Sequence, residues 1–362
     1  MSTIADARVY LVDLEVETVR TDAVQSFLKQ ETLFVEIETV DGLTGTGYAY
    51  TIGTGGQAVL SMLRDHLVPR LIGENSAQIE HLWMELFCST RATTVGAITS
   101  LALAAIDTAL WDLKCKRASA PLWEVAGGFR QDVPLYDTER GWLHLTSDEL
   151  VAGAIASRDA GWKGLKVKVG KPSHREDLER LLAVRKAVGD RMDIMVDANQ
   201  SMTSAEAIRR ARAFEQADLF WLEEPLPADD VAGHVRLARA TSIPIAVGES
   251  MYSIAQFREY LERGAASILQ VDVARIGGIT PWLKVAHLAE AFNVSVCPHF
   301  LMELHVSLAA AVPNGAYVEH IPQLRAITNG EMLIADGRAW APNSVGLGID
   351  WNRDAIDDRM VA

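Results

Sequence analysis

The chain has 362 residues and a formal net charge of −14 at pH 7, with 49% hydrophobic and 23% charged residues. This length suits two domains or one large α/β barrel with additions. The negative charge argues against a nucleic acid or an anionic membrane as a partner. No apolar run reaches the roughly 18 residues of a membrane span, and no basic-then-apolar segment opens the chain, so we expect a cytoplasmic protein. Cys88, Cys115 and Cys297 are widely spaced, which predicts neither a disulfide framework nor a zinc site.

The first 130 residues are predicted to form strands followed by helices. Runs rich in β-branched and aromatic residues predict strands at 9–12, 32–38 and 45–50. Helical patterns follow at 57–71, 76–87 and 97–116. The glycine-rich stretch 53–56 could cradle a phosphate, but it lacks the signatures of a P-loop or a dinucleotide site, so a mobile loop is favoured.

From about residue 131 the pattern alternates between strand and helix. Eight strands are predicted, at 133–137, 164–169, 192–197, 219–223, 244–249, 267–272, 294–299 and 316–319. Helical patterns separate them, from Ser147 and at 174–188, 203–217, 228–240, 253–263, 279–291 and 303–312. This order predicts a (β/α)8-type barrel. The tail, 325–362, has loop and short-strand character and is expected to pack on the N-terminal part.

Two lysines stand two residues apart in the apolar run 164–170. Side chains alternate along a strand, so Lys166 and Lys168 point to the same face. If that face is buried, the two ammonium groups lower the pKa of at least one lysine, and such a lysine is a usable base. The alternative is an edge strand with two solvated lysines.

Polar residues mark the ends of the predicted barrel strands. They follow one another at intervals of 20 to 29 residues, about one strand–helix unit each: Lys168, Asp197, Glu223, Glu249, Asp272, His299 and Glu319. The chemistry of such barrels lies at the carboxyl ends of the strands. These side chains are therefore expected to circle one mouth.

Three of these residues predict a magnesium site. Asp197, Glu223 and Glu249 offer carboxylate oxygens from adjacent strands, which suit a hard divalent cation such as Mg²⁺. The alternative, that they cap helices or pair with lysines, holds well for a single carboxylate and poorly for three in register. Glu224 competes with Glu223, and strand alternation favours Glu223 as the ligand.

His299 is predicted to form an acid/base pair with Asp272. The aspartate ends the neighbouring strand and could hold the tautomer of the imidazole and raise its basicity. A lone histidine would more often be structural. Lys168 and His299 would then flank one metal-bound substrate and act on opposite faces of one carbon.

These residues resemble the enolase superfamily, and within it the mandelate racemase subgroup. The resemblance rests on Lys166-Val-Lys168, Asp197-Ala-Asn199, Trp221-Leu-Glu223-Glu224-Pro225, Gly248-Glu249, Asp272, His299, Glu319 and the stretch 105–112. It implies a modified (β/α)7β barrel at 131–324. It also implies an α+β capping domain, built from residues 1–130 and the tail 325–362.

The resemblance also implies roles for single residues. Mg²⁺ would bind to Asp197, Glu223 and Glu249. Lys168 would be one base, with Lys166 lowering its pKa and touching the substrate carboxylate, and the His299–Asp272 pair would be the other acid/base group. A protonated Glu319 would hydrogen-bond the substrate carboxylate, and Asn199 would help binding near the metal. A homo-oligomer, specifically an octamer, is implied in the same way.

The expected reaction begins with removal of the proton α to a carboxylate. Dehydration of an acid sugar to a 2-keto-3-deoxy acid is favoured, because several segments look most like galactarate/talarate-type dehydratases of the subgroup. Racemisation or epimerisation of a 2-hydroxy acid is the alternative, and a non-catalytic binding barrel is a third reading. A diacid needs a cation at its far end, for which Arg20, Lys29 and Arg140 are candidates, with Thr138 as a hydrogen-bonding partner.

Overall fold

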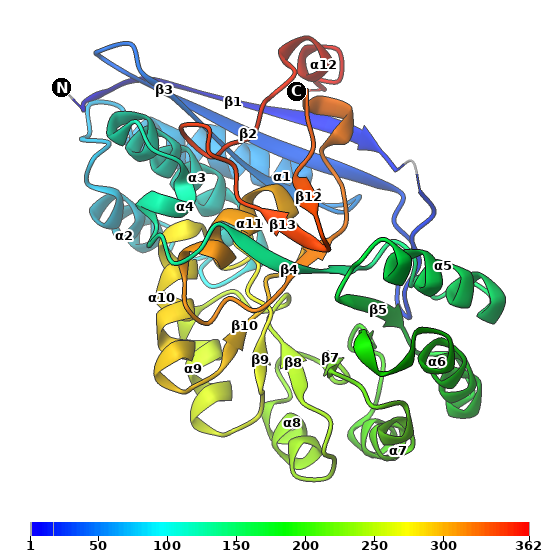
Figure 1. Cartoon of the computed structure of the whole chain (residues 1–362). Coiled ribbons are helices and arrows are strands. Elements are labelled where there is room, and N and C mark those ends of the chain that lie inside the picture. Colours follow the sequence, from blue (N-terminus) through cyan, green and yellow to red (C-terminus); the bar gives the residue numbers. More distant parts are fainter. Residues whose placement is uncertain (1, 17, 362) are drawn as a thin grey trace.

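The computed structural model describes residues 2–16 and 18–361, and Figure 1 shows an N-terminal sheet with helices beside a larger barrel. The N-terminal sheet is antiparallel in the order β1 (Ile4–Glu15), β2 (Lys29–Thr39), β3 (Thr44–Thr51). Helical segments follow it: α1 (Gly56–Ser61), a π-helical turn (Met62–Leu67), a 3-10 turn (Val68–Arg70), α2 (Ile79–Ser89), α3 (Ala97–Ala118) and α4 (Leu122–Val125). The helix predicted at 57–71 is therefore α-helical only in its first turns.

The long helix α3 packs closely against β3 because the residues that face each other, glycines on β3 and alanines on α3, are small. A Cβ on Gly47 would lie 2.1 Å from the carbonyl oxygen of Ala105, and one on Gly45 would lie 2.3 Å from that of Ala109. Glycine opposite alanine lets strand and helix approach closely. On another face of α3, Asp107 accepts hydrogen bonds from the N–H and hydroxyl of Thr280, at the start of a barrel helix. The helix thus joins the sheet to the barrel.

The barrel is a closed ring of parallel strands. In the described part of the chain its strands are β4 (Asp132–Asp137), β5 (Gly164–Lys168), β6 (Asp193–Asp197), β7 (Trp221–Glu223), β8 (Ile245–Val247), β9 (Ile268–Leu269), β10 (Ser295–Val296) and β11 (Val318–His320). The strands pair in this order, and β11 pairs with β4. A parallel bridge from Val296 to Gly315, just before β11, closes the ring.

The seven helices between these strands form the outer layer of the described barrel (Figure 1): α5 (Ser147–Asp159), α6 (His174–Val188), α7 (Ser204–Phe214), α8 (Val231–Ala238), α9 (Ile254–Glu262), α10 (Ile279–Ala291) and α11 (Met302–Ala311). Short 3-10 turns extend two of them, at Gly189–Arg191 and Glu215–Ala217. Several begin at a polar cap. Thr146 and Glu149 form a capping box on α5, as Ser253 and Gln256 do on α9. The predicted (β/α)7β barrel is confirmed.

The C-terminal tail contacts both the barrel and the N-terminal sheet. A 3-10 turn (Arg325–Ile327) leads to a hairpin of β12 (Leu333–Ala335) and β13 (Arg338–Trp340), and β13 pairs antiparallel with β4. The remaining chain, with α12 (Arg353–Asp357), crosses to the N-terminal sheet, where the Trp351 ring lies 4.9 Å from that of Phe34 (Figure 1). The sequence predicted the second contact and did not predict the hairpin on the barrel. The domain boundaries near 130 and 324 stay predictions.

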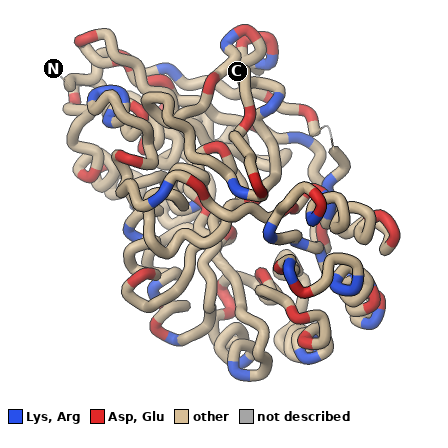
Figure 2. The backbone as a smooth tube through the Cα atoms, viewed as in Figure 1, with Lys and Arg blue, Asp and Glu red and all other residues tan. Residues whose placement is uncertain are grey.

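One alternative and one expectation from the sequence can be judged against this fold. The strand with the paired lysines lies inside the ring, between β4 and β6, so the solvated edge strand is wrong. Among the described residues, no helix is long and apolar enough to cross a membrane. Figure 2 shows acidic and basic positions interspersed along the outer helices rather than gathered in one basic face.

The close approach of β3 and α3 predicts a specific sensitivity. We expect Gly47→Ala to lower the free energy of unfolding by about 1–3 kcal/mol, because the new methyl group must displace the α3 backbone. Gly330→Ala is the matched control, since a Cβ there meets nothing within 4 Å and should change stability by less than about 0.5 kcal/mol. Urea unfolding followed by circular dichroism measures both, and equal effects would contradict the packing argument.

Candidate active site

The polar ring stands on an apolar floor inside the barrel. Met195, Trp221, Cys297 and Tyr317 are buried members of one apolar cluster, and each precedes a polar residue by two positions. Because side chains two apart share a face, the residues that follow them, Asp197, Glu223, His299 and Glu319, point into the same interior one layer higher. The indole N–H of Trp221 donates to Glu223 Oε2 at 3.0 Å, which ties the two layers together.

Asp197, Glu223 and Glu249 form a group suited to a metal ion. One oxygen from each lies within 4.8 Å of the others, and all three side chains are buried. Burial raises the pKa of Glu223 to about 8, and the charge of Asp197 adds to the effect. Lys168 and Lys166 offset part of the negative charge of this group, and a divalent cation can offset the rest. The donor set therefore fits Mg²⁺.

Glu224 lies outside this group, although it is next in sequence to Glu223. Its Oε2 accepts a hydrogen bond from the hydroxyl of Ser250 at 3.3 Å, and the side chain is 1% exposed. The backbone of Glu224 has a positive φ of 38°, which turns the chain after β7. The structure thus brings Glu223, rather than Glu224, to Asp197 and Glu249.

The two lysines are buried and bound to carboxylates. Lys168 Nζ contacts Asp197 Oδ2 at 2.5 Å and Asn199 Oδ1 at 3.1 Å. Lys166 Nζ lies 3.0 Å from Glu223 Oε1 and 2.8 Å from Glu319 Oε1. Burial disfavours both ammonium groups, but the carboxylates outweigh it and raise the pKa of each lysine. The predicted lowering of a lysine pKa is wrong for this arrangement, because the pair repulsion is weaker than the attraction of the carboxylates.

The His299–Asp272 pair is present and extends to the N-terminal sheet. His299 Nδ1 lies 2.8 Å from Asp272 Oδ2, and its Nε2 lies 3.3 Å from Glu249 Oε2. Burial opposes ionisation of Asp272, but the hydrogen bond from His299 lowers its pKa to about 2. The Tyr50 hydroxyl, on β3, donates to the same Asp272 oxygen at 2.6 Å. Arg275 donates to the Glu249 carbonyl at 2.8 Å.

Sequence reasoning missed Tyr50 and Arg275. Tyr50 ended a predicted strand and carried no signal of its own, because its role depends on how β3 meets the barrel. Arg275 could have been found, since it lies three residues after Asp272 in the loop that follows a barrel strand.

The neighbours of Glu319 favour its ionised form. Its Oε1 accepts from the Thr138 hydroxyl at 2.6 Å and its Oε2 from the Phe300 N–H at 2.8 Å. Burial raises its pKa, but Lys166 and then His299 outweigh burial, so the pKa lies below the ordinary value. The expectation of a protonated Glu319 is therefore wrong for this arrangement. Thr138 is brought into the site through this contact.

Three predicted substrate-binding cations are engaged elsewhere. Arg20 bonds to Glu139, to the Gln323 side chain and to the Pro322 carbonyl. Lys29 pairs with Asp13 and Glu31. Arg140 bonds to Asp137 at 2.5 Å and reaches toward the Ser157 hydroxyl on α5, outside the ring. The structure does not join these cations to the metal group.

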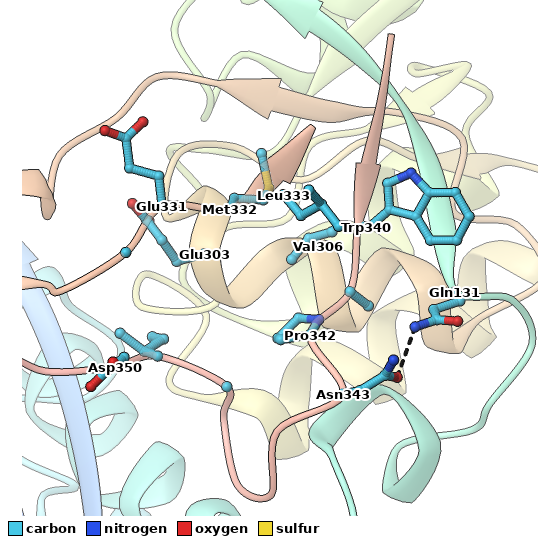
Figure 3. A pocket seen from close by; sticks show the side chains of 14 residues that line it. Gln131, Glu303, Val306, Glu331, Met332, Leu333, Trp340, Pro342, Asn343 and Asp350 are labelled. Atoms are coloured by element: carbon cyan, nitrogen blue, oxygen red, sulfur yellow. Dashed lines mark hydrogen bonds between the residues drawn. The ribbon is translucent and has the colours of Figure 1, made fainter. Parts of the chain in front are cut away.

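A separate pocket lies beside α11, where the hairpin β12–β13 covers the barrel (Figure 3). Its lining includes Glu303, Val306, Met332 and Trp340, and none of the residues in the polar ring. Burial raises the pKa of Glu303 to about 7. Figure 3 shows Glu331 and Trp340 directed away from one another, while Gln131 and Asn343 bond to each other. This pocket therefore does not contain the metal-binding and acid/base residues of the barrel mouth.

Comparison with known proteins agrees with the fold and with this site. Residues 6–127 match the N-terminal domain of the mandelate racemase/muconate lactonizing enzyme family, and residues 149–355 match the enolase C-terminal domain-like family. The ring of strand-end carboxylates, lysines and histidine therefore sits in a barrel of the enolase superfamily. Within it, the chain belongs to the mandelate racemase/muconate lactonizing enzyme family.

Similar proteins carry several activities. The chain is 38% identical to an L-talarate/galactarate dehydratase of Salmonella typhimurium, over 89% of this chain and 81% of that protein. It is 38% identical to a 3,6-anhydro-alpha-L-galactonate cycloisomerase of Streptomyces coelicolor, over 88% of each. An L-talarate dehydratase structure from Polaromonas sp., complexed with Mg and L-glucarate, aligns with a TM-score of 0.94 at 38% identity, over 99% of this chain and 98% of that one.

A structure described as a racemase from Streptomyces coelicolor, with bound magnesium, aligns with a TM-score of 0.95 at 36% identity, over 99% of this chain and all of that one. Mg²⁺, expected from the sequence, is thus supported by the buried carboxylate group and by the magnesium in two related structures.

The two adjacent glutamates allow a direct test of the metal group. We expect Glu223→Gln to weaken Mg²⁺ binding about 10-fold or more, because it removes a charged oxygen ligand from the group. Glu224→Gln, the matched control, should change the affinity far less. Isothermal titration with Mg²⁺ measures both. A larger loss in the Glu224 variant would contradict the assignment.

Proposed function

We propose that this protein removes the proton α to the carboxylate of an acid sugar and then eliminates water to give a 2-keto-3-deoxy acid. The observation that carries the proposal is the order of groups around the ring. Lys168 touches Asp197 at one end of the carboxylate group, and His299 touches Glu249 at the other. Two acid/base groups thus flank the place where Asp197, Glu223 and Glu249 would hold Mg²⁺ and the substrate carboxylate.

The difficulty of the first step is the weak acidity of the α-hydrogen. Its removal leaves an enediolate with charge on the carboxylate oxygens, and a bound Mg²⁺ supplies Lewis-acid stabilisation for that charge. Lys166, held between Glu223 and Glu319, offers a fixed ammonium beside the same position. Asn199 is placed next to Lys168 and can orient the substrate there.

Lys168 and His299, which flank the site, have different roles in proton transfer. The C–H bond breaks with its proton moving to the neutral amine of Lys168, and the electron pair stays on the enediolate. Asp197 favours the ammonium form of Lys168 in this arrangement, and ligation of a metal by Asp197 would weaken that attraction. The electron pair of the enediolate then forms the double bond between the α- and β-carbons while the bond to the β-hydroxyl breaks and a protonated His299 donates from Nε2, so that water leaves. The enol that results takes up a proton at the β-carbon and becomes the 2-keto-3-deoxy acid.

Sequence similarity first suggests an aldarate such as galactarate or talarate as the substrate, because a relative at 38% identity is a dehydratase of these acids. A relative with the same identity acts on an anhydro-galactonate, which is a monocarboxylic acid. Acid sugars are thus the supported substrate class. The cytoplasmic location and the homo-octamer stay predictions.

A racemase or epimerase of a 2-hydroxy acid is the second candidate. The same placement of Lys168 and His299 at opposite ends of the carboxylate group favours it, because reprotonation from the far face inverts the carbon. A non-catalytic barrel has less support, since a binding site does not require both acid/base groups.

The proposal predicts the products of a broad screen. Incubation of the protein and Mg²⁺ with a library of aldonates and aldarates should give a 2-keto acid from at least one of them, detected with semicarbazide. A parallel incubation in D₂O separates the candidates. Deuterium at the α-carbon without keto acid would favour the racemase or epimerase. No signal from any acid would refute both.

The separate roles of Lys168 and His299 predict different defects. His299→Asn should lower keto-acid formation by about 10²–10⁴-fold, the usual contribution of a general acid, while α-hydrogen exchange with D₂O continues. Lys168→Ala should abolish both exchange and elimination. Mass spectrometry of recovered substrate gives the exchange rate. Loss of exchange in the His299 variant, with retained exchange in the Lys168 variant, would reverse the assignment.

A further inference from the structure

The chain after β1 folds into a small hairpin at the barrel mouth, residues 20–27, here called the capping hairpin. Thr21 and Ser26 form its antiparallel bridge. Leu143 N donates to the Thr21 carbonyl at 3.0 Å, which ties the hairpin to the segment after β4. Its tip touches the segment after β5, because a Cβ on Gly170 would lie 2.6 Å from that of Ala23. The hairpin therefore lies over the strand end that carries Lys168.

Asp22 is the buried acid of this hairpin. It is 7% exposed, and its Oδ1 accepts hydrogen bonds from the N–H groups of Val24 and Gln25, both at 2.8 Å. Its Oδ2 is also buried, and no described residue donates to it. Burial raises the pKa of Asp22, and the largest opposing influence is the positive charge of Lys168. One carboxylate oxygen near the proposed base thus lacks a donor.

A buried acceptor without a donor is costly, so the missing partner should come from outside the chain. A sugar hydroxyl is such a donor. A carboxylate is not, and it would bring a second negative charge toward Asp22. Like charges placed together discriminate against the wrong ligand.

The three cations that the sequence offers for a second substrate carboxylate already have acidic partners. Arg20 is 6% exposed and bonds to Glu139 and to two acceptors near Gln323. Lys29 and Arg140 are paired with other acids. Each of the three cations expected at the far end of a diacid would thus have to leave an existing partner in order to hold a second carboxylate.

We propose that Oδ2 of Asp22 accepts a hydrogen bond from a substrate hydroxyl, and that the substrate is a polyhydroxy monocarboxylate rather than a dicarboxylate. This inference rests on the proposed function, because it takes Lys168 as the base beside the reacting carboxylate. It departs from the aldarate that sequence similarity first suggests. Asp22 then acts as a residue that selects the substrate.

The test compares aldonate and aldarate partners of the same configuration, for example galactonate with galactarate, over the hexose and pentose series. With Mg²⁺ present, kcat/KM for keto-acid formation should be at least about 10-fold higher for the aldonate of the preferred pair. Asp22→Asn keeps the Oδ1 acceptor of the hairpin and removes the charge. It should lower kcat/KM for the aldonate about 10-fold or more and leave or raise that for the aldarate.

Asp190→Asn is the matched control, because Asp190 is exposed in the 3-10 turn that precedes β6, at the opposite end of the barrel strands from the polar ring. It should leave the preference unchanged. Isothermal titration of each acid to the Mg²⁺-loaded protein gives a second readout that needs no turnover, and the aldonate should bind more tightly to the wild type than to the Asp22 variant.

The outcomes are distinguishable. Preference for the aldarate of a pair, or an equal effect of Asp22→Asn on both partners, would overturn this inference and leave the proposed reaction standing. Absence of binding and of turnover with every acid would overturn both.

Discussion

Buried charge compensation is the constraint on which this structure depends. Asp197, Glu223, Glu249 and Glu319 place four carboxylates inside the barrel, and Lys166 and Lys168 oppose them with two ammonium groups. Isolated charges are too costly to bury, so each group persists only because the others are near. The excess of negative charge matches a divalent cation. The same balance explains why the lysines keep raised pKa values while Glu223 resists ionisation.

Apolar packing beneath the site holds these charged side chains in position. An apolar layer with Met195, Trp221, Cys297 and Tyr317 fills the barrel beneath the polar ring, and strand alternation places each polar side chain directly above it. The N-terminal sheet is held by the close contact of Gly47 with α3. That contact also brings Tyr50 to Asp272, so the histidine pair is completed by a residue from the other part of the molecule.

The proposed chemistry and the proposed selectivity belong to different segments. The strand ends hold the groups that we propose to move protons and to bind the metal, which is where barrels of this kind place their chemistry. The capping hairpin contributes Asp22 near Lys168, and its neighbours Arg20 and Glu139 neutralise one another. A change of substrate can therefore come from the hairpin without disturbing the charge balance below it, which is consistent with the different activities named for relatives of equal identity.

The sequence by itself determined the barrel, its strand-end residues and the metal group, because alternation and regular spacing are local properties that survive folding. Asp197, Glu223 and Glu249 could be found in this way, and Glu223 could be preferred to Glu224. The pairings were decided only by the tertiary structure. Arg20, Lys29 and Arg140 looked available in the sequence, but each is paired with an acid: Arg20 with Glu139, far away in the chain, Lys29 with Asp13 and Arg140 with the nearby Asp137. The states of Lys168 and Glu319, and the contact of Tyr50 with Asp272, depend on distances between elements that no local pattern records.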